Sequence, residues 1–395
     1  MGDSFFLVLL LLALAAIILR QDFVLTLVYF FAAAYAAGRG WSRRALNAIQ
    51  FQRTYPHRVF LHEQIPVQLD LINTGWLPVI WAQLMDSLPV ELIVPNSFRR
   101  VIALGPYGRA RLDYTLRAAR RGCYAIGPLY LRSGDLFGLS ADAENAGQPD
   151  RLIVYPRIIP LTRVPLPSRS PHGALRTTQP IFEDPARVRG KRDYAAGDSF
   201  RRIDWKTSAA AGRLQVKILE PSIALETLIV LNLNTDEYDY RTRSDATELA
   251  VVTAASLANW LVGQRESIGL AANGADPLNE DRPLPVLYPR KGRAHLMNVL
   301  DVLARARAAR VGPLIDVLRR ETPRLSWGTT LVLITGSADE AAFDAIFRAR
   351  RAGLNVVLIL VGLVMDAEAI RDRARHFGVP LFEFLRERDL DVWRQ

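Results

Sequence analysis

The sequence has a single cysteine, Cys123, so the chain cannot form an internal disulfide bond. One isolated thiol fits a reducing compartment, where disulfides are rare. The residues that follow it, Tyr-Ala-Ile, read as part of a strand and carry no catalytic signature. We therefore interpret Cys123 as a small apolar group packed inside a strand.

The common enzyme motifs are also missing. The sequence contains no GxxxxGK[ST] or GxGxxG loop, no HExxH and no GxSxG. The five histidines are dispersed, and the closest pair, His57 and His62, has a spacing that suits neither one helix face nor one strand face. Nucleotide binding of these kinds, zinc proteolysis and serine catalysis therefore have no motif support.

Lysine is scarce: only four of the 50 basic residues are lysines. The formal net charge of +10 would favour nucleic acid or an anionic membrane surface as a partner. However, the arginines are scattered along the chain, and no recognition helix or zinc-finger pattern accompanies them. We therefore do not expect nucleic-acid binding.

What the sequence has in abundance is apolar residues. Half of its 395 residues are hydrophobic, which is enough for two or three domains with sizeable cores. Two apolar runs, Phe5–Leu19 and Phe23–Ala37, flank the polar triplet Arg20–Asp22. Each run is short for a lone span, and the pair predicts a two-helix transmembrane hairpin over residues 4–38.

A cleaved signal peptide is the alternative for the first run. The hairpin is favoured because Asp3, rather than a positive charge, precedes that run and because a second apolar run follows at once. Arg39, Arg43 and Arg44 come directly after the second run. By the positive-inside rule they place the rest of the chain in the cytoplasm, with Trp41 at the membrane interface.

The residue pattern changes after the two apolar runs. Residues 51–160 contain short alternating stretches, such as Val67–Ile72 and Arg111–Leu116, cut by proline and glycine. Periodic short strands of this kind predict a β-sandwich. Residues 161–186 are rich in proline, serine, arginine and threonine without apolar periodicity, which predicts an exposed linker.

The segment over residues 187–220 is the most informative stretch. Basic residues alternate with Asp193, Asp198 and Asp204, so the charges can pair with one another or with a partner. Alternation from Leu214 predicts a strand. A solvated, salt-bridged linker is the plain alternative. The residues that we expect to carry a function here are Arg192, Tyr194, Gly197, Asp198, Arg201, Asp204 and Trp205.

Residues 221–395 alternate between strands and helices. Apolar strands such as Leu228–Leu231 and Leu331–Ile334 are typical of a parallel sheet buried on both faces. The pattern predicts a doubly wound α/β domain. The expected strands are Thr227–Leu233, Ser267–Ala272, Thr329–Ile334 and Asn355–Val361, and the expected helices are Asp245–Val262, Ala294–Ala309, Pro313–Arg320, Asp339–Arg350 and Asp366–His376.

The spacing Arg-x-Tyr-x-x-Gly-Asp-x-x-Arg-x-Ile-Asp-Trp, which begins at Arg192 and ends at Trp205, resembles the signature of the DUF58 family. Pieces of 121–157, such as Arg121–Pro128, are also similar to what precedes that signature. The resemblance implies a bacterial inner-membrane protein with a von Willebrand factor A-like (vWA-like) domain, associated with a MoxR-type AAA+ ATPase.

vWA domains place an Asp-x-Ser-x-Ser metal motif after their first strand, so the resemblance also implies a place for Mg²⁺ or Ca²⁺. The equivalent positions are Asn232, Asn234 and Asp236. Here the first aspartate is Asn232, both serines are replaced, and Gly336 stands where a second aspartate is expected. The alternative is a turn whose polar groups cap the next helix.

Taken with the resemblance, these features lead us to expect a non-enzymatic, membrane-anchored scaffold or adaptor that works in protein assembly or maturation. We also expect the signature segment to lock onto the vWA-like sheet. One alternative is a carboxylate-dependent hydrolase, built on Asp193, Asp198 and Asp204, that acts on cell-envelope material. The other is a binder of anionic lipid or nucleic acid.

Overall fold

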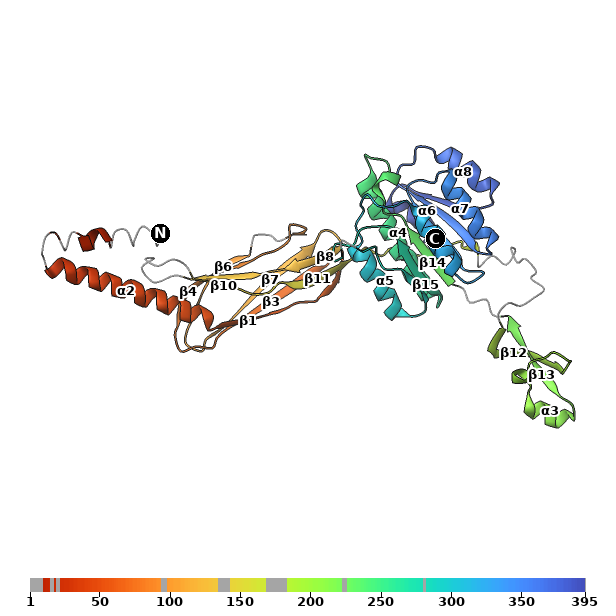
Figure 1. Ribbon diagram of the computed structural model, residues 1–395, viewed down its shortest axis with the longest axis horizontal. Helices are drawn as coiled ribbons and strands as arrows, with labels where there is room; N and C mark the ends of the chain where they lie inside the picture. The colour runs from red at the N-terminus through yellow and green to blue at the C-terminus, as the bar shows by residue number, and fades with distance from the viewer. Residues whose placement is uncertain are drawn as a thin grey trace. The chain divides into compact units, whose positions relative to one another are not determined.

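The computed structural model describes residues 10–14, 18, 22–93, 98–133, 143–167, 183–221, 226–279 and 282–394. The chain divides into two compact units. The first comprises Met1–Arg157 with Leu303–Arg305, and the second comprises Ile158–Val302 with Ala306–Gln395. In Figure 1 the first unit runs from red to yellow, and the second from yellow-green to blue.

The first unit begins with a long apolar helix, α2, over Asp22–Asn47. By length and composition α2 could cross a membrane; the buried core helix α4 (Arg243–Gly263) of the second unit passes the same test. Most of the first apolar run, Phe5–Leu19, lies outside the described residues. The two-helix arrangement therefore stays a prediction. What the structure describes is the apolar helix α2 and, within the first run, helical residues at 10–14 and 18.

Helix α2 continues to Asn47, past residue 38, where the predicted transmembrane hairpin ends. Its last turns bury Ser42, Ala45 and Leu46. Ala45 and Leu46 belong to the same core cluster as Leu69 and Leu84 of the following β-domain. Tertiary burial therefore extends the helix beyond its apolar run and builds it into the domain.

Three sheets form the rest of the first unit. Their orders are β1-β3-β7-β5, β10-β9-β4-β6 and β2-β11-β8. The strands are β1 (Ile49–Thr54), β2 (Arg58–Phe60), β3 (Gln64–Asn73), β4 (Val79–Asp86), β5 (Leu92–Ile93), β6 (Arg99–Leu104), β7 (Arg109–Ala118), β8 (Gly122–Ile126), β9 (Leu129–Ser133), β10 (Ala143–Ala146) and β11 (Asp150–Tyr155).

The first sheet packs face to face on the other two. Leu71 of β3 shares one core cluster with Leu84 of β4 and Leu131 of β9. At its other end, β3 places Val67 in a second cluster with Leu152 of β11. Alternation along β3 puts these residues on one face, as a half-buried strand requires.

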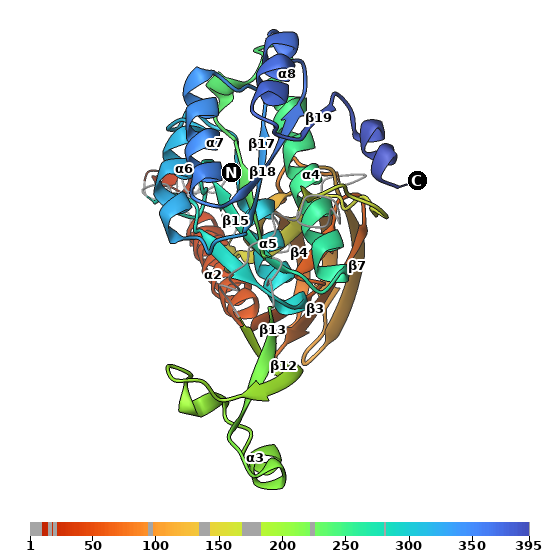
Figure 2. The ribbon, with the colours of Figure 1, turned by 90° about the vertical axis from the view of Figure 1, so that its right-hand side faces the viewer.

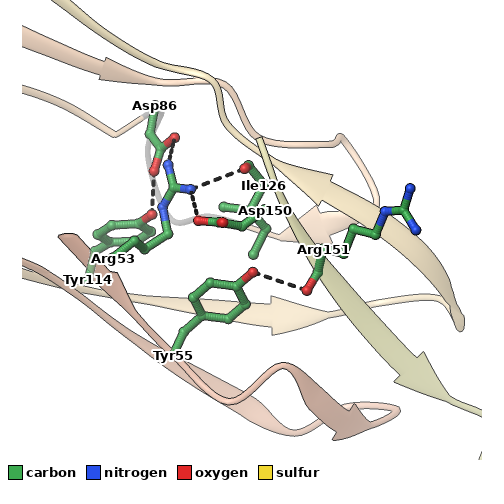
Figure 3. A network of polar contacts seen from close by, with 7 residues as sticks. All are labelled: Arg53, Tyr55, Asp86, Tyr114, Ile126, Asp150 and Arg151. Carbon is green, nitrogen blue, oxygen red and sulfur yellow. Dashed lines mark hydrogen bonds and ion pairs between the residues drawn. The ribbon is translucent and has the colours of Figure 1, made fainter. Parts of the chain in front are cut away.

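A buried arginine joins the three sheets (Figure 3). Arg53 of β1 donates to the carboxylates of Asp86, at the end of β4, and Asp150, at the start of β11, each at 2.8 Å. Tyr114 of β7 donates to the second oxygen of Asp86 at 2.5 Å. Burial raises the pKa of Tyr114, and the carboxylate of Asp86 beside it acts in the same direction. In this cluster, the neutral phenol of Tyr114 is therefore hydrogen-bonded to the ion pair of Arg53 and Asp86.

The predicted linker over 161–186 is wrong at both described ends. Val164 and Leu166 are buried in the second unit, where the N–H of Thr162 donates to the carbonyl of Trp393 at 2.7 Å. Strand β12 (Glu183–Asp193) begins inside the linker's last residues. Residues 168–182 lie outside the described part of the chain.

The second unit contains a six-stranded sheet of order β16-β15-β14-β17-β18-β19, parallel except for β16. Its strands are β14 (Glu226–Leu231), β15 (Ser267–Ala272), β16 (Leu287–Arg290), β17 (Thr330–Thr335), β18 (Asn355–Val361) and β19 (Leu381–Phe384). Its helices are α4, α5 (Arg293–Arg305), α6 (Leu314–Glu321), α7 (Glu340–Arg351) and α8 (Ala367–His376), with short 3-10 helices η3 (Thr235–Glu237), η4 (Thr322–Arg324) and η5 (Glu387–Trp393).

Helices cover both faces of this sheet (Figure 2). Leu228 and Leu331 share a core cluster with residues of α6, α7 and α8. Helix α4 packs against β14, β15, β17 and β18 from the other side. Numbered within the sheet, the strand order is 3-2-1-4-5-6, so the order reverses between β14 and β17. A doubly wound sheet binds its ligands at that point, beyond the carboxyl ends of the strands.

The helix expected over Ala294–Ala309 ends earlier, at Arg305. The residues after it bond to two loops instead of continuing the helix. Arg307 forms an isolated bridge with Ala275, and Ala309 forms one with Asn234. Pairing across the sheet edge therefore overrides local helix propensity here.

The signature segment forms an antiparallel β-hairpin of β12 and β13 (Gln215–Pro221). Between the strands lie a 3-10 helix, η2 (Phe200–Arg202), and a short helix, α3 (Trp205–Ala211). β13 confirms the strand expected from Leu214, although of its alternating residues Val216 is buried while Ile218 is exposed. We call residues 183–221 the signature hairpin.

Candidate functional site

The signature hairpin contains a bidentate ion pair. Both terminal nitrogens of Arg192, on β12, donate to the carboxylate of Asp198 at 2.6 Å. The backbone N–H of Ala195 donates to the same carboxylate at 2.9 Å. Gly197, with a φ of +105°, makes the turn that directs the chain back toward Arg192. Hydrogen bonds from Arg192 and from Ala195 lower the pKa of Asp198 to about 2.

A second carboxylate starts helix α3. Asp204 is its N-cap and accepts the N–H of Thr207 at 3.1 Å. Lys191, on β12, forms an ion pair with the other oxygen of Asp204 at 2.8 Å. The hydrogen bond from Lys191, followed by that from Thr207, lowers the pKa of Asp204 to about 2. Lys191 was not among the expected site residues, although it directly precedes Arg192 in the sequence.

The third carboxylate lies where the two strands of the signature hairpin meet the connecting segment. Asp193 accepts a hydrogen bond from Gln215 of β13 and pairs with Arg213 at 3.0 Å. The described contacts of these three carboxylates therefore lie within the hairpin itself. The docking of the hairpin onto the α/β sheet stays a prediction.

Large apolar side chains lie on the outside of the signature hairpin. Tyr194 stacks on Phe200 with ring centroids 5.8 Å apart. Phe200 is 69% exposed and Trp205 is 66% exposed, whereas Ile203 and Val216 are buried. Rings of this size are normally more than half covered, so the hairpin presents an apolar surface with no cover among the described residues.

A buried polar network lies at the carboxyl edge of the α/β sheet. Asn232 follows β14, and its amide donates to Thr335, the last residue of β17, at 2.8 Å. The same amide nitrogen donates to Glu237 at 2.8 Å. The amide oxygen of Asn232 accepts from the N–H of Asn234 at 3.0 Å and from Asn273, after β15, at 2.9 Å. The network therefore joins the ends of three parallel strands at the reversal point.

Glu237 supplies the charge of this network. One oxygen of Glu237 accepts from the amide of Asn234 at 3.1 Å and from the N–H of Leu314, at the start of α6, at 3.2 Å. The carboxylate therefore holds the first residue of α6 while it orients two asparagines. Sequence reasoning missed Glu237 and Asn273. A polar residue directly after a buried strand was the signal available for Asn273.

The residues expected to hold a cation do not come together as ligands. Asn232 and Asn234 are in the buried network, but Asp236 is 57% exposed on its side chain and pairs with Arg310 at 3.2 Å. The amide oxygen of Asn234 accepts backbone N–H groups, including that of Asp236 at 3.3 Å. Because these oxygens are already used, the arrangement does not fit Mg²⁺ or Ca²⁺.

The other carboxylates near this edge have local roles. Asp339 is the N-cap of α7 and accepts the N–H of Ala342 at 2.8 Å. Asp239 accepts the N–H of Arg241 at 3.0 Å. Among the described residues, no group of three or more His, Cys, Asp or Glu side chains is placed to hold a metal ion.

A cavity of about 290 Å³ opens beside the network, between α6 and α7. Its polar lining includes Glu237, Thr335 and Asp339, and its apolar lining includes Leu318 and Ile346. It lies at the strand-order reversal, where doubly wound folds bind ligands.

The two units thus define a mixed α/β protein with a parallel-rich sheet, an antiparallel β-domain and an apolar N-terminal helix. The model of a family described as "Protein of unknown function DUF58" matches residues 190–368. The match spans the signature residues and most of the α/β sheet, so the resemblance to DUF58 is confirmed there. The similar pieces within 121–157 lie outside the matched residues.

An uncharacterised protein, YeaD of Bacillus subtilis (strain 168), is 27% identical over 289 residues, covering 72% of this chain and 68% of YeaD. Among solved structures, an aerotolerance-related membrane protein from Bacteroides fragilis, crystallised with multiple mutations to serines, matches 43% of this chain and 94% of its own at 14% identity and a TM-score of 0.29. The CARDB domain of PF1109 from Pyrococcus furiosus, in complex with di-metal ions, matches 27% of this chain and 86% of its own at 13% identity and a TM-score of 0.20. Structural likeness this low carries no functional argument.

Proposed function

We propose that this protein is a membrane-anchored, non-enzymatic scaffold that presents its α/β unit and its signature hairpin to protein partners. The observation that carries the proposal is the hairpin surface, where Phe200 and Trp205 are exposed while the neighbouring carboxylates are bonded internally. Exposed tryptophan and arginine are the side chains that most often anchor protein interfaces. Arg201, which lies between the two aromatic residues in the sequence and is exposed, adds a cation to the hairpin surface.

The state of Asp198 and Asp204 argues against a general-acid role for these two carboxylates. Asp198 and Asp204 have pKa values of about 2, so both stay ionised at neutral pH. An ionised carboxylate that is held by a cation and a backbone N–H is a poor general acid, because a catalytic acid needs a pKa near the working pH. These groups build the hairpin instead.

The finer features of the proposal come from the DUF58 resemblance. The α/β unit is a vWA-like domain, and its partner is a MoxR-type AAA+ ATPase that acts in protein assembly or maturation. Helix α2 holds the chain in the bacterial cytoplasmic membrane, with Arg43 and Arg44 on the cytoplasmic side. The sheet order 3-2-1-4-5-6 with an antiparallel third strand supports a doubly wound domain of this kind.

The test is direct binding between the full-length chain in lipid nanodiscs and a purified MoxR-type AAA+ ATPase. Phe200→Ala and Trp205→Ala should each weaken the affinity about tenfold or more, because each removes an interface anchor. Val392→Ala, at an exposed apolar position of the second unit, should leave the affinity unchanged. No binding by the unmodified chain would exclude this partner. Equal binding by all the variants would exclude the hairpin surface.

A further inference from the structure

Three aromatic residues lie at the end of the β-domain where α2 enters. The rings of Trp41, on α2, and Trp76, between β3 and β4, meet edge to face with centroids 6.4 Å apart. The indole N–H of Trp41 donates to the carbonyl of Pro78 at 3.0 Å. The next loop, between β6 and β7, joins them because the N–H of Tyr107 donates to the carbonyl of Gly75 at 3.1 Å.

Two of these rings are far more exposed than aromatic rings usually are. Trp76 is 69% exposed and Tyr107 is 68% exposed. Tyr107 also has a φ of +55°, in the left-handed region that side chains other than glycine, asparagine and aspartate rarely adopt. Glycines stand nearby at 105 and 108, but the position with the positive φ is itself occupied by tyrosine and not by glycine. A strained backbone that displays a large aromatic side chain points to a function for that side chain.

The length of α2 relates these rings to a membrane. Residues 23–38 carry no charge, and Asp22 and Arg39 are the first charged residues on either side. At 1.5 Å per residue, the helix from Asp22 to Trp41 is about 28 Å long, close to the thickness of the hydrocarbon core. A helix that spans the membrane therefore places Trp41 at the second interface, together with the loops that touch it.

The three segments that carry these aromatic residues have charge of one sign. The segments 38–48, 73–78 and 104–109 contain no aspartate or glutamate. Their charged residues are Arg39, Arg43, Arg44 and Arg109, and all but Arg39 are exposed. Tryptophan and tyrosine collect at the headgroup level of membranes, and arginine is attracted to anionic headgroups there.

We propose that this end of the β-domain is a membrane-contact surface that lies in the headgroup layer of an anionic leaflet. The surface consists of the loops that carry Trp76 and Tyr107, together with Trp41 of α2. The inference rests on the proposed membrane anchor and adds a second contact to it. Because Ala45 and Leu46 fix α2 in the β-domain core, one orientation of the helix sets the orientation of the whole β-domain.

Spin labels on the full-length chain test the contact. In a Cys123→Ser background, single cysteines at Trp76, Tyr107, Val90 and Phe30 are labelled, and the chain is placed in nanodiscs of phosphatidylglycerol and phosphatidylcholine. Val90 is the matched control, because it is 94% exposed and lies in the loop after β4, whereas Trp76 lies in the loop before it. Unchanged thermal unfolding in detergent shows that each variant has folded.

We expect the labels at 76 and 107 to be several-fold less accessible to an aqueous nickel reagent than the label at 90, and more accessible to oxygen. The label at 30 should report hydrocarbon. If the labels at 76 and 107 are as accessible to the nickel reagent as the label at 90 while the label at 30 is in hydrocarbon, the proposed contact surface is wrong but the membrane anchor is supported. If 30 is in water too, the anchor itself fails. If 76 and 107 are shielded from both reagents, protein rather than lipid covers them, which also overturns the proposal.

The lipid charge is tested in the same samples. Replacing phosphatidylglycerol with phosphatidylcholine should move the labels at 76 and 107 outward, and Arg43→Gln with Arg44→Gln should do the same in the anionic nanodisc. If neither change alters the depth of the two labels, the anionic part of the proposal is wrong.

Discussion

The chain contains two arginine–aspartate clusters, one in the β-domain and one in the signature hairpin. The side chains of Arg53 and Asp86 are 1% and 0% exposed, whereas those of Arg192 and Asp198 are 47% and 17% exposed. The geometry of the pairs is similar, with N–O distances of 2.8 and 2.6 Å. The difference is the surroundings, because water screens the hairpin pair while the β-domain pair has only its own partners.

This comparison teaches that the same chemistry serves two purposes. The Arg53 cluster adds buried charged cross-links between three sheets whose shared cores are apolar. Breaking one side of such a buried pair leaves an uncompensated charge. The hairpin pairs contribute little to global stability. They shape a small surface on which Phe200 and Trp205 stay exposed.

The largest effect should come from Arg53→Met. The substitution leaves the buried carboxylate of Asp86 without its cation, and the free energy of unfolding of the β-domain should fall by about 3–5 kcal/mol. Denaturant unfolding of the full-length chain in detergent measures the change. Arg111→Met is the matched control, because Arg111 pairs with Asp70 at 2.7 Å on the exposed side of the same domain. Equal stability of the two variants would show that burial does not decide the strength of the cluster.

An intermediate effect should follow from Asn232→Asp. The new carboxylate would face Glu237, whose oxygen now lies 2.8 Å from the amide nitrogen of Asn232. Two like charges at this distance should lower the free energy of unfolding at pH 7 by about 3 kcal/mol, and less at pH 5, where the pair takes up a proton. Asn355→Asp, at another amide of the same sheet, is the control. Recovery on addition of Mg²⁺ would show that the edge accepts a cation once it has been charged, and unchanged stability at pH 7 would contradict the network.

The smallest effect should be the acid titration of the signature hairpin. Asp198 and Asp204 have pKa values of about 2, below the ordinary value of about 3.9. A lowered pKa means that their stabilising bonds are complete above about pH 4 and are lost as the pH falls toward 2. The amide signals of Ala195 and Thr207, which bond to the two carboxylates, should therefore shift near pH 2 in NMR spectra.

Asp198→Asn provides the control for this titration. It should remove the inflection at Ala195 and leave that at Thr207, because Asp204 keeps its partner Lys191. Inflections near pH 4 in the unmodified chain would mean that the hairpin carboxylates are not held by their cations in solution.

Sequence patterns predicted the α/β unit well where strands are buried on both faces. The expected strands Ser267–Ala272 and Asn355–Val361 coincide with β15 and β18. Two edge strands were missed for identifiable reasons. β16 contains Pro289, which argues against a strand unless it lies at an edge, as it does here. β19 has only four residues, too few for a period to emerge.

The candidate sites divide in the same way. The signature hairpin was visible because its partners are close along the chain: Arg192 and Asp198 are six residues apart. The Arg53 cluster could not be predicted from the sequence, because its carboxylates, Asp86 and Asp150, are 33 and 97 residues from Arg53. Only part of the network at the sheet edge could be predicted from the sequence. Asn232 and Asn234 directly follow β14, whereas Asn273 and Thr335 belong to the ends of other strands.

The sequence by itself therefore determined the apolar helix, the change from alternating to buried strands and the charged signature, because each depends on neighbours along the chain. Only the tertiary structure decided that α2 continues into the β-domain core, that one arginine joins three sheets and that Glu237 uses the amides expected to bind a cation. Those features depend on which side chains burial brings together, and burial acts between residues that are far apart in sequence.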